Sequence, residues 1–340
     1  MITNKELFDT VNGQPVYKLS LTNANNMTIS CLSYGANWYE LLVPTAAGPQ
    51  NLILNFAKIA DYQATNEYLN MSIGRVAGRI GQGQFKIGDH HYQVAANEGR
   101  NTLHGGPHGF NQINWDSEVV ANQIIFTHKI TNAVDSFPGD LDVTLTYTLT
   151  DDNQVLLDYN VLSHGETVFN PTNHAYFNLN ADDKNIKNLT LRLKSSHRLA
   201  LDTEKIPTGQ TLVNTDTPYG FETQKTLGAA IDGLQTIPEK GIDDVYLIDR
   251  HADNDPIAVL SHPTNHISVS IFSQRNAIVL FTANDFGPDQ PYLTKTGQNY
   301  VGVALEAQIA PNAIFDHDYG DFSLQDGERQ HYQTKYQVRF

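Results

Sequence analysis

Residues 141–149 read Leu-Asp-Val-Thr-Leu-Thr-Tyr-Thr-Leu, with an apolar side chain at every second position. Successive side chains point to opposite faces of a β-strand, so this period of two predicts a strand with one apolar and one polar face. The same alternation returns in residues 189–194 and in residues 267–271. Repeated segments of this kind predict a fold that is built mainly from β-strands.

Turn and helix signals favour an antiparallel arrangement of these strands. Gly88-Asp89 stands between two short strand-like runs and predicts a two-residue hairpin turn. The fair helix candidates are short pieces near residues 57–62 and 226–231, and the polar run 181–188 predicts a loop. Because strands do not alternate with long helices, we expect an all-β fold class, a large antiparallel β-sandwich. No repeat or low-complexity linker divides the sequence, so we expect one domain over residues 1–340.

Composition narrows the classes of partner. The chain has 37 acidic and 22 basic residues, and its net charge of −15 opposes binding to nucleic acid or to an anionic membrane surface. Cys31 is the single cysteine, so no disulfide can form within the chain, as is usual in a reducing compartment. The first residues lack the apolar core of a secretory signal, and no apolar run is long enough to span a membrane. We therefore expect a cytoplasmic protein.

Two glycine-rich segments carry polar residues that ordinary strands do not need. Residues 74–83 hold four glycines and two arginines, one of them Arg79, and glycine lets the backbone approach a ligand closely. The glycine spacing is not that of a phosphate loop, and a plain turn with a surface arginine fits equally well. Residues 101–110 place His104 and His108 around Gly-Gly-Pro. Glycine and proline prevent a helix from aligning the two histidines, and no carboxylate is near in sequence, so we expect no metal site.

Three further segments hold candidate acid and base groups. His174 lies in Asn-Pro-Thr-Asn-His-Ala-Tyr-Phe-Asn-Leu, where polar neighbours can orient its ring, although a structural histidine in a capped turn is the alternative. Glu306 shares one strand face with Gly302 and Ala304, which leave space for a ligand. Walling this carboxyl from water would raise its pKa. An ordinary exposed glutamate is the alternative there, and Asp243-Asp244 could either close a turn or bind sugar hydroxyls.

Five segments taken together resemble the galactose mutarotase (aldose 1-epimerase) family. They follow in the family's order from about Tyr34 to Ala313, which is most of the chain. The matching segments are Tyr34-Gly35-Ala36 with Leu42-Val43-Pro44, residues 74–80, residues 101–110, residues 170–179, and Leu305-Glu306-Ala307-Gln308 with Pro311-Asn312-Ala313.

The resemblance implies a galactose mutarotase-like β-supersandwich with an open sugar cleft. It assigns the general base to Glu306, as a carboxylate, and the general acid to His174, as an imidazolium. It implies that Arg79, His104 and Asp243 bind the sugar. The implied reaction interconverts the α and β anomers of a free hexose such as galactose or glucose. This chemistry needs no metal and no cofactor, its partner is a free monosaccharide, and we expect a monomer or a homodimer.

Four positions depart from the family pattern. Gly78 stands where many members have asparagine, and Val279 stands where some have a glutamine that touches the sugar. Ala310 and Asn312 replace the usual phenylalanine and aspartate. Glu306 and His174 are both present, so these departures bear on sugar preference and affinity rather than on the reaction.

Three other functions fit part of the pattern. A glycosidase could use Glu306 with Asp243 or Asp244 as its two carboxyl groups, and a noncatalytic sugar-binding module would need no acid and base at all. A hexose-6-phosphate 1-epimerase would need several cationic side chains in the cleft. Arg79 is already assigned to the sugar, so such a cleft would need cations from elsewhere in the chain, for which the candidates are Lys194, Arg198 and Arg275. For the aromatic side chain that stacks on the sugar, the candidates are Phe286 and Trp115.

Overall fold

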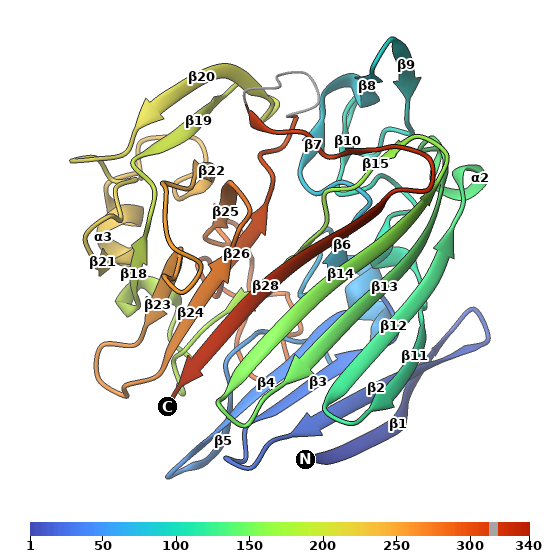
Figure 1. Cartoon of the computed structure of the whole chain (residues 1–340). Coiled ribbons are helices and arrows are strands. Elements are labelled where there is room, and N and C mark those ends of the chain that lie inside the picture. Colours follow the sequence, from blue (N-terminus) through green and yellow to red (C-terminus); the bar gives the residue numbers. More distant parts are fainter. Residues whose placement is uncertain (313–318) are drawn as a thin grey trace.

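A nine-stranded antiparallel sheet forms the largest layer of the computed structural model, which describes residues 1–312 and 319–340. The predicted motif residue Ala313 lies outside these described residues. Figure 1 shows the long strands β28, β14, β13 and β12 running side by side in this sheet. Its strands, in spatial order, are β11 (Asp116–Val120), β12 (Gln123–Ile130), β13 (Asp140–Leu149), β14 (Gln154–His164), β28 (Arg329–Arg339), β24 (Ser268–Ser273), β23 (Ala258–Ser261), β18 (Thr190–Leu193) and β21 (Lys225–Thr226).

Two smaller sheets complete the main layers. In Figure 1 the five-stranded sheet is the blue part of the ribbon, and its strand β2 contacts β11 and β12. The five strands are β1 (Ile2–Val11), β2 (Gln14–Thr22), β3 (Thr28–Leu32), β4 (Asn37–Thr45) and β5 (Gly48–Asn51). The six-stranded sheet has the order β17 (Tyr176–Phe177), β26 (Val303–Gln308), β25 (Ala277–Phe281), β22 (Asp243–Leu247), β19 (His197–Leu201) and β20 (Pro207–Val213).

The remaining elements are short. Four strand pairs are β7 (Arg79–Ile80) with β10 (Thr102–Leu103), β6 (Ser72–Ile73) with β16 (Thr172–Asn173), β15 (Thr167–Val168) with β27 (Ser323–Leu324), and β8 (Gln84–Ile87) with β9 (His90–Gln93). The helices are α1 (Ile59–Ala64), α2 (Asn132–Asp135) and α3 (Leu227–Asp232), with 3₁₀ turns η1 (Gly81–Gly83), η2 (Phe110–Gln112) and η3 (Ile186–Asn188). Within the described residues, no helix is both long and apolar enough to cross a membrane.

The all-β expectation is confirmed, and the local expectations hold with two differences. The Gly88-Asp89 hairpin joins β8 to β9, and two of the helices fall on the two predicted pieces, while α2 was not expected. The strand at 141–149 was expected to have a polar, solvated face. Thr146 and Thr148 on that face are buried instead, and the Gln123 side chain donates a hydrogen bond to Thr148 at 3.2 Å. Packing on both sides of a strand is a tertiary effect that an alternating pattern does not encode.

The core is centred where three sheets meet around Trp38 of β4. This side chain has no exposed surface, and its ring packs against the rings of Tyr147 on β13, Phe177 on β17 and Tyr336 on β28, with centroids 5.0–6.1 Å apart. Large aromatic side chains dominate the apolar area that a fold buries. Trp38 therefore ties the smaller sheets to the nine-stranded one and holds them at a fixed distance from the strands that carry the site.

Candidate active site

A cavity of about 740 Å³ opens beside the six-stranded sheet. It is lined by residues from β7, β17, β22, β25 and β26 and from the loops around residues 62–68 and 285–290. The structure brings all five predicted site residues to this one cavity, namely Arg79, His104, His174, Asp243 and Glu306. Residues separated by more than 200 positions in the sequence thus line the same cavity.

His174 and Glu306 form a buried pair at the floor of the cavity. His174 lies between β16 and β17, Glu306 lies on β26, and β17 pairs with β26. The distance between His174 Nε2 and Glu306 Oε1 is 3.4 Å, and the side chains are only 6% and 2% exposed. The other polar atoms, His174 Nδ1 and Glu306 Oε2, make no hydrogen bond to any described residue. A buried polar atom without a partner is costly, so these atoms are available to a ligand.

Burial controls the ionisation of both groups. It raises the pKa of Glu306 to about 8, with the negative charge of Asp243 adding to the effect and Arg79 opposing it. Burial also lowers the pKa of His174 to about 4. Near neutral pH the proton of the pair therefore lies on the carboxyl group, whereas the sequence-based assignment expected a carboxylate and an imidazolium. Because the groups are so close, their titration belongs to the pair and not to either residue alone.

His104 is a neutral hydrogen-bond donor. Its Nδ1 accepts the backbone N–H of Gly78 at 3.2 Å, which leaves the ring hydrogen on Nε2. Burial, together with the nearby His174 and Arg79, lowers the pKa of His104 well below its ordinary value. The following Gly105 has φ of 86°, and a Cβ there would lie 1.8 Å from the carbonyl oxygen of Gly74. Only glycine lets the loop bring His104 against that backbone.

One nitrogen from each of His104 and His174 and an oxygen of Glu306 lie within 4.8 Å of one another, which is close enough to hold a metal ion. The hydrogen bonding of His104 does not suit this role. A ligating histidine normally donates its other N–H, whereas His104 accepts a backbone N–H at Nδ1. His108 is exposed and does not line the cavity. The expectation of a site without metal remains a prediction.

Arg79 and Asp243 lie on the rim. Glu98 binds Arg79 in a fork, with Nε to Oε2 at 2.6 Å and Nη2 to Oε1 at 2.7 Å, and this fixes the guanidinium plane. Its Nη1 makes no hydrogen bond among the described residues and can donate to a sugar hydroxyl. The Asp243 carboxylate is 31% exposed and lies 3.7 Å from Lys205 Nζ. Asp244 also lines the cavity, but Arg198 engages its carboxylate at 3.4 Å.

Some residues of the cavity were not found from the sequence. Tyr68 packs edge-on against His104 at 4.7 Å, and Lys205 and Glu67 lie in irregular segments without a motif. Of the two aromatic candidates, Phe286 lines the cavity. Trp115 does not, because it packs in the core against Phe110 at 5.3 Å. Tyr176 offers a further ring, and its place two residues after His174 was the signal that could have revealed it.

The cavity is strongly acidic. Among the described lining residues the arginines and lysines are Arg79 and Lys205, and each faces a carboxylate, Glu98 and Glu239 respectively. The cations that could have folded into the cleft do not line it: Lys194 pairs with Asp255, Arg198 with Asp244, and Arg275 lies buried against Asn170. The lining carboxyl groups are those of Glu67, Glu98, Asp243, Asp244, Asp285 and Glu306.

The four departures from the family pattern fall at different distances from the cavity. Gly78 has φ of 74°, and a Cβ there would lie 2.7 Å from Cβ of Pro311, so asparagine does not fit this backbone. Val279 lines the cavity directly opposite Glu306 in the β25–β26 pairing. Ala310 is buried outside the lining, and Asn312 accepts the Gly81 N–H at 3.4 Å. Gly78 also lines the cavity but has no side chain, so Val279 is the departure whose side chain can contact a ligand.

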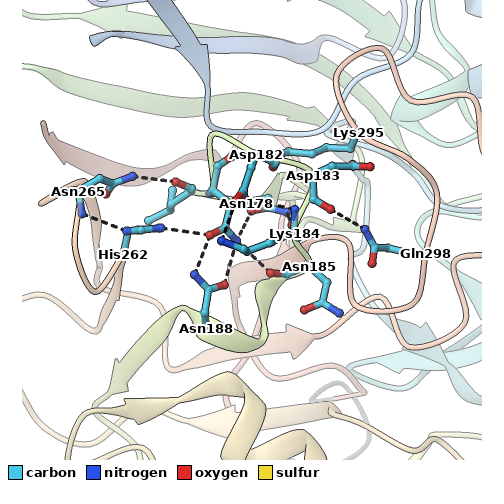
Figure 2. A network of polar contacts seen from close by, with 12 residues as sticks. Asn178, Asp182, Asp183, Lys184, Asn185, Asn188, His262, Asn265, Lys295 and Gln298 are labelled. Atoms are coloured by element: carbon cyan, nitrogen blue, oxygen red, sulfur yellow. Dashed lines mark hydrogen bonds and ion pairs between the residues drawn. The ribbon is translucent and has the colours of Figure 1, made fainter. Parts of the chain in front are cut away.

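A loop between β25 and β26, residues 282–302, forms one wall of the cavity and is called the wall loop below. Figure 2 shows how its far end is anchored to the segment 178–188. The buried Lys295 ammonium donates to the carbonyl oxygens of Asn180 and Asp182. Gln298 donates to the carbonyl of Asp183 at 2.9 Å. These contacts hold in place the loop that carries Phe286 and Gln290 into the cavity lining.

Known proteins share this fold and sequence. Residues 17–337 match the family model described as aldose 1-epimerase. A Levilactobacillus brevis protein named maltose epimerase is 36% identical over 330 residues, which are 95% of each chain. An aldose 1-epimerase of Streptococcus thermophilus is 34% identical over 98% of this chain and 97% of its own. The crystal structure of galactose 1-epimerase from Lactobacillus acidophilus NCFM superposes with a TM-score of 0.86 at 25% identity, over 99% of this chain and 98% of that one. The chain, with its galactose mutarotase-like fold, therefore belongs to the aldose 1-epimerase family of isomerases.

Proposed function

We propose that this protein interconverts the α and β anomers of free hexoses such as galactose and glucose, with Glu306 and His174 as the catalytic pair. The observation that carries the proposal is the buried contact of 3.4 Å between these two cavity-lining side chains, each of which keeps a polar atom without a hydrogen-bond partner among the described residues. Arg79, His104 and Asp243 surround the pair and bind the sugar hydroxyls. The whole chain acts as one domain in the cytoplasm, in keeping with its single, buried cysteine.

Anomer exchange requires one proton to leave and another to arrive. The C1 hydroxyl gives its proton to Glu306 while His174 donates a proton to the ring oxygen, and the C1–O5 bond breaks. The open-chain aldehyde then turns about the C1–C2 bond and closes on its other face, with the two residues exchanging roles. Each such group contributes about 10²–10⁴-fold to the rate. The reaction transfers only protons, so the proposal uses no metal and no cofactor.

The burial-shifted pKa values are compatible with this scheme because the pair needs one proton between its two members. Transfer of that proton from Glu306 to His174 creates opposite charges 3.4 Å apart, and these attract more strongly than exposed charges because both side chains are buried from water. Hydrogen bonds donated by the sugar hydroxyls stabilise the carboxylate form of Glu306. Binding of the substrate therefore favours the reactive arrangement that burial alone disfavours.

The acidic cavity argues against a hexose 6-phosphate as the preferred substrate. Both lining cations already face carboxylates, and a phosphate group would meet the surrounding negative charge. A reducing disaccharide is a second candidate substrate. The relative from Levilactobacillus brevis is named maltose epimerase, and the cavity volume of about 740 Å³ leaves space beyond one hexose ring.

Polarimetry tests the proposal on freshly dissolved α-D-galactose and α-D-glucose. We expect the wild type to accelerate the approach to rotational equilibrium. Glu306→Gln and His174→Asn should each lower kcat by at least about 10²-fold, the smaller effect of losing an acid or a base. Glu6→Gln, an exposed glutamate on β1, is the matched control and should retain the wild-type rate. A near-normal kcat in either cavity variant would remove that residue from the mechanism.

A further inference from the structure

Two tyrosine rings lie beside the ring of His174 and nearly parallel to it. The centroid of the Tyr176 ring is 5.0 Å away, with the two planes 30° apart, and that of the Tyr68 ring is 6.1 Å away, with the planes 26° apart. Tyr176 belongs to β17 and follows His174 by two residues. Tyr68 comes from a distant part of the sequence, between α1 and β6, so its place beside His174 is a product of the tertiary fold.

Tyr68 contacts the second histidine of the cavity as well. Its ring packs edge-on against His104 with centroids 4.7 Å apart, and the rings of His104 and His174 lie 5.3 Å apart with their planes at 80°. Each of the three rings therefore contacts the other two. Rings at these separations prefer edge-to-face or offset arrangements, so Tyr68 restricts the tilt that either histidine can adopt.

Backbone hydrogen bonds tie the segment that carries Tyr68 to His174. The Met71 N–H donates to the Tyr68 carbonyl at 3.0 Å and closes a turn. The His174 N–H donates to the Met71 carbonyl at 3.0 Å, and the Asn70 N–H donates to the His174 carbonyl at 3.1 Å. The side chain of Asn70 also accepts the Tyr176 N–H at 2.9 Å. These bonds fix the position of Tyr68 relative to His174.

The backbone of Tyr68 has an unfavourable conformation. Its φ of 51° lies in the left-handed region, which residues with bulky side chains seldom occupy. Such conformations persist only where the surrounding structure enforces them, and they are concentrated at functional sites. Tyr68 also lines the cavity. The strain thus falls on the residue that brings one ring against both histidines.

The proposed reaction requires a positive charge on His174 at the moment when this residue acts as the acid, whereas burial favours the neutral ring. The face of an aromatic ring is negative and attracts a cation that lies within about 6 Å of the ring centroid. Tyr68 and Tyr176 lie at about this distance, and their nearly parallel planes turn a face toward the imidazole. Both rings are therefore placed to stabilise the charged form of His174.

We propose that Tyr68 is a positioning residue of the anomer exchange, which acts through His174 and His104. Its ring fixes the tilt of both histidines, and its face stabilises His174 while that residue carries the proton that passes to the ring oxygen of the sugar. Tyr176 adds a second aromatic face. The inference rests on the proposed function and deepens it, because it identifies what favours a charged acid at a buried position.

The first test compares Tyr68→Leu and Tyr68→Phe with the wild type by polarimetry on α-D-galactose. Leucine removes the aromatic ring, whereas phenylalanine keeps it. We expect Tyr68→Leu to lower kcat at least about tenfold and to change KM less than about threefold, because the ring acts on the acid and not on the sugar. Tyr68→Phe should keep kcat within about threefold of the wild type. Tyr92→Leu on β9 is the matched control. It removes a ring that packs on Phe85 at 5.5 Å outside the cavity lining, and it should leave kcat unchanged.

A second measurement separates the charge of the ring face from the shape of the ring. Tyr68 is replaced by phenylalanine and by its difluoro and pentafluoro analogues, in which fluorine withdraws electrons from the face and leaves the outline of the ring nearly unchanged. We expect kcat to fall with each step of fluorination, by at least about fivefold from phenylalanine to the pentafluoro analogue.

Equal kcat values along the fluorinated series would overturn the inference, and so would a normal kcat in Tyr68→Leu or a loss that Tyr68→Phe shares. The series decides the matter even if Tyr68→Leu does not fold, because all its members keep the aromatic ring. A wild type that is inactive on every free hexose would instead overturn the proposed function.

Discussion

Replacing Glu306 by glutamine should stabilise the folded protein at alkaline pH while it removes activity. Burial raises the pKa of this carboxyl group from an ordinary value of 4.5 to about 8 in the folded protein. The folded state thus binds the proton more tightly than the unfolded state does. The resulting stabilisation is complete below pH 4.5 and is lost as the pH rises through 8. Between pH 5 and pH 9 this one group should cost the wild type up to about 4 kcal/mol in free energy of unfolding.

Urea unfolding at pH 5, 7 and 9 measures this effect as a difference between proteins. Two other groups also change the stability with pH. Burial raises the pKa of Glu67 to about 7, so its contribution to stability is also lost as the pH rises. Burial lowers the pKa of His174 to about 4, so its contribution to stability is lost as the pH falls from 6.5 through 4. The Glu67 contribution is common to the wild type and Glu306→Gln and largely cancels in the comparison, whereas the His174 contribution is coupled to Glu306 and differs between the two proteins below about pH 6.5. The free energy of unfolding of the variant should therefore gain on that of the wild type by several kcal/mol from pH 5 to pH 9.

The control is Glu6→Gln, which changes an exposed carboxyl group on β1 and should follow the pH dependence of the wild type. If Glu306→Gln also ran parallel to the wild type over this range, the carboxyl group would not hold its proton to about pH 8. The reasoning from burial would then be wrong. A parallel course with lost activity would still leave Glu306 in the catalytic pair but ionised at neutral pH.

Three further predictions concern activity. A plot of kcat/KM against pH should be bell-shaped, because the pair takes up a second proton, on His174, below about pH 4 and loses its shared proton above about pH 8. A profile with a single limb would contradict the shared proton. Excess chelator should leave the rate unchanged, because His104 is hydrogen-bonded unsuitably for a metal, and a loss that zinc restores would contradict this. At fixed ionic strength, kcat/KM for free galactose or glucose should exceed that for glucose 6-phosphate at least about tenfold, because Arg79 and Lys205 already face carboxylates. This ratio corresponds to about 1.4 kcal/mol of transition-state discrimination. Equal or faster turnover of the phosphate ester would favour a hexose-6-phosphate epimerase.

Much of the fold could be predicted because its signals are local, whereas the proposed pairing of Glu306 with His174 came from the family resemblance. The alternation in β13 and β18 is written in neighbouring residues, and the small residues beside Glu306 on β26 indicate a space above that face. The groups around the pair behave differently. Glu67 and Lys205 enter the cavity through contacts between distant segments, and no local pattern records them.

The protonation order of the pair was also out of reach of the sequence. Charge chemistry alone suggests an ionised Glu306 and a protonated His174. The reversal follows from the depth at which both are buried, which is set by how three sheets pack. The place of Trp115 could not be predicted either, because a large aromatic side chain can face a sugar or fill the core. In the structure it fills the core.

The position of β28 has a consequence for how the chain is made. This strand, the last one along the sequence, is inserted between β14 and β24 and pairs with both. Until residues 329–339 have left the ribosome, the edges of β14 and β24 present unpaired backbone groups, the kind of edge through which nascent chains aggregate. The two halves of the large sheet are thus joined only when their central strand has been made. We expect ribosome-bound chains that end before β28 to be open to protease and to bind chaperones, because the sheet is complete only once this strand has emerged.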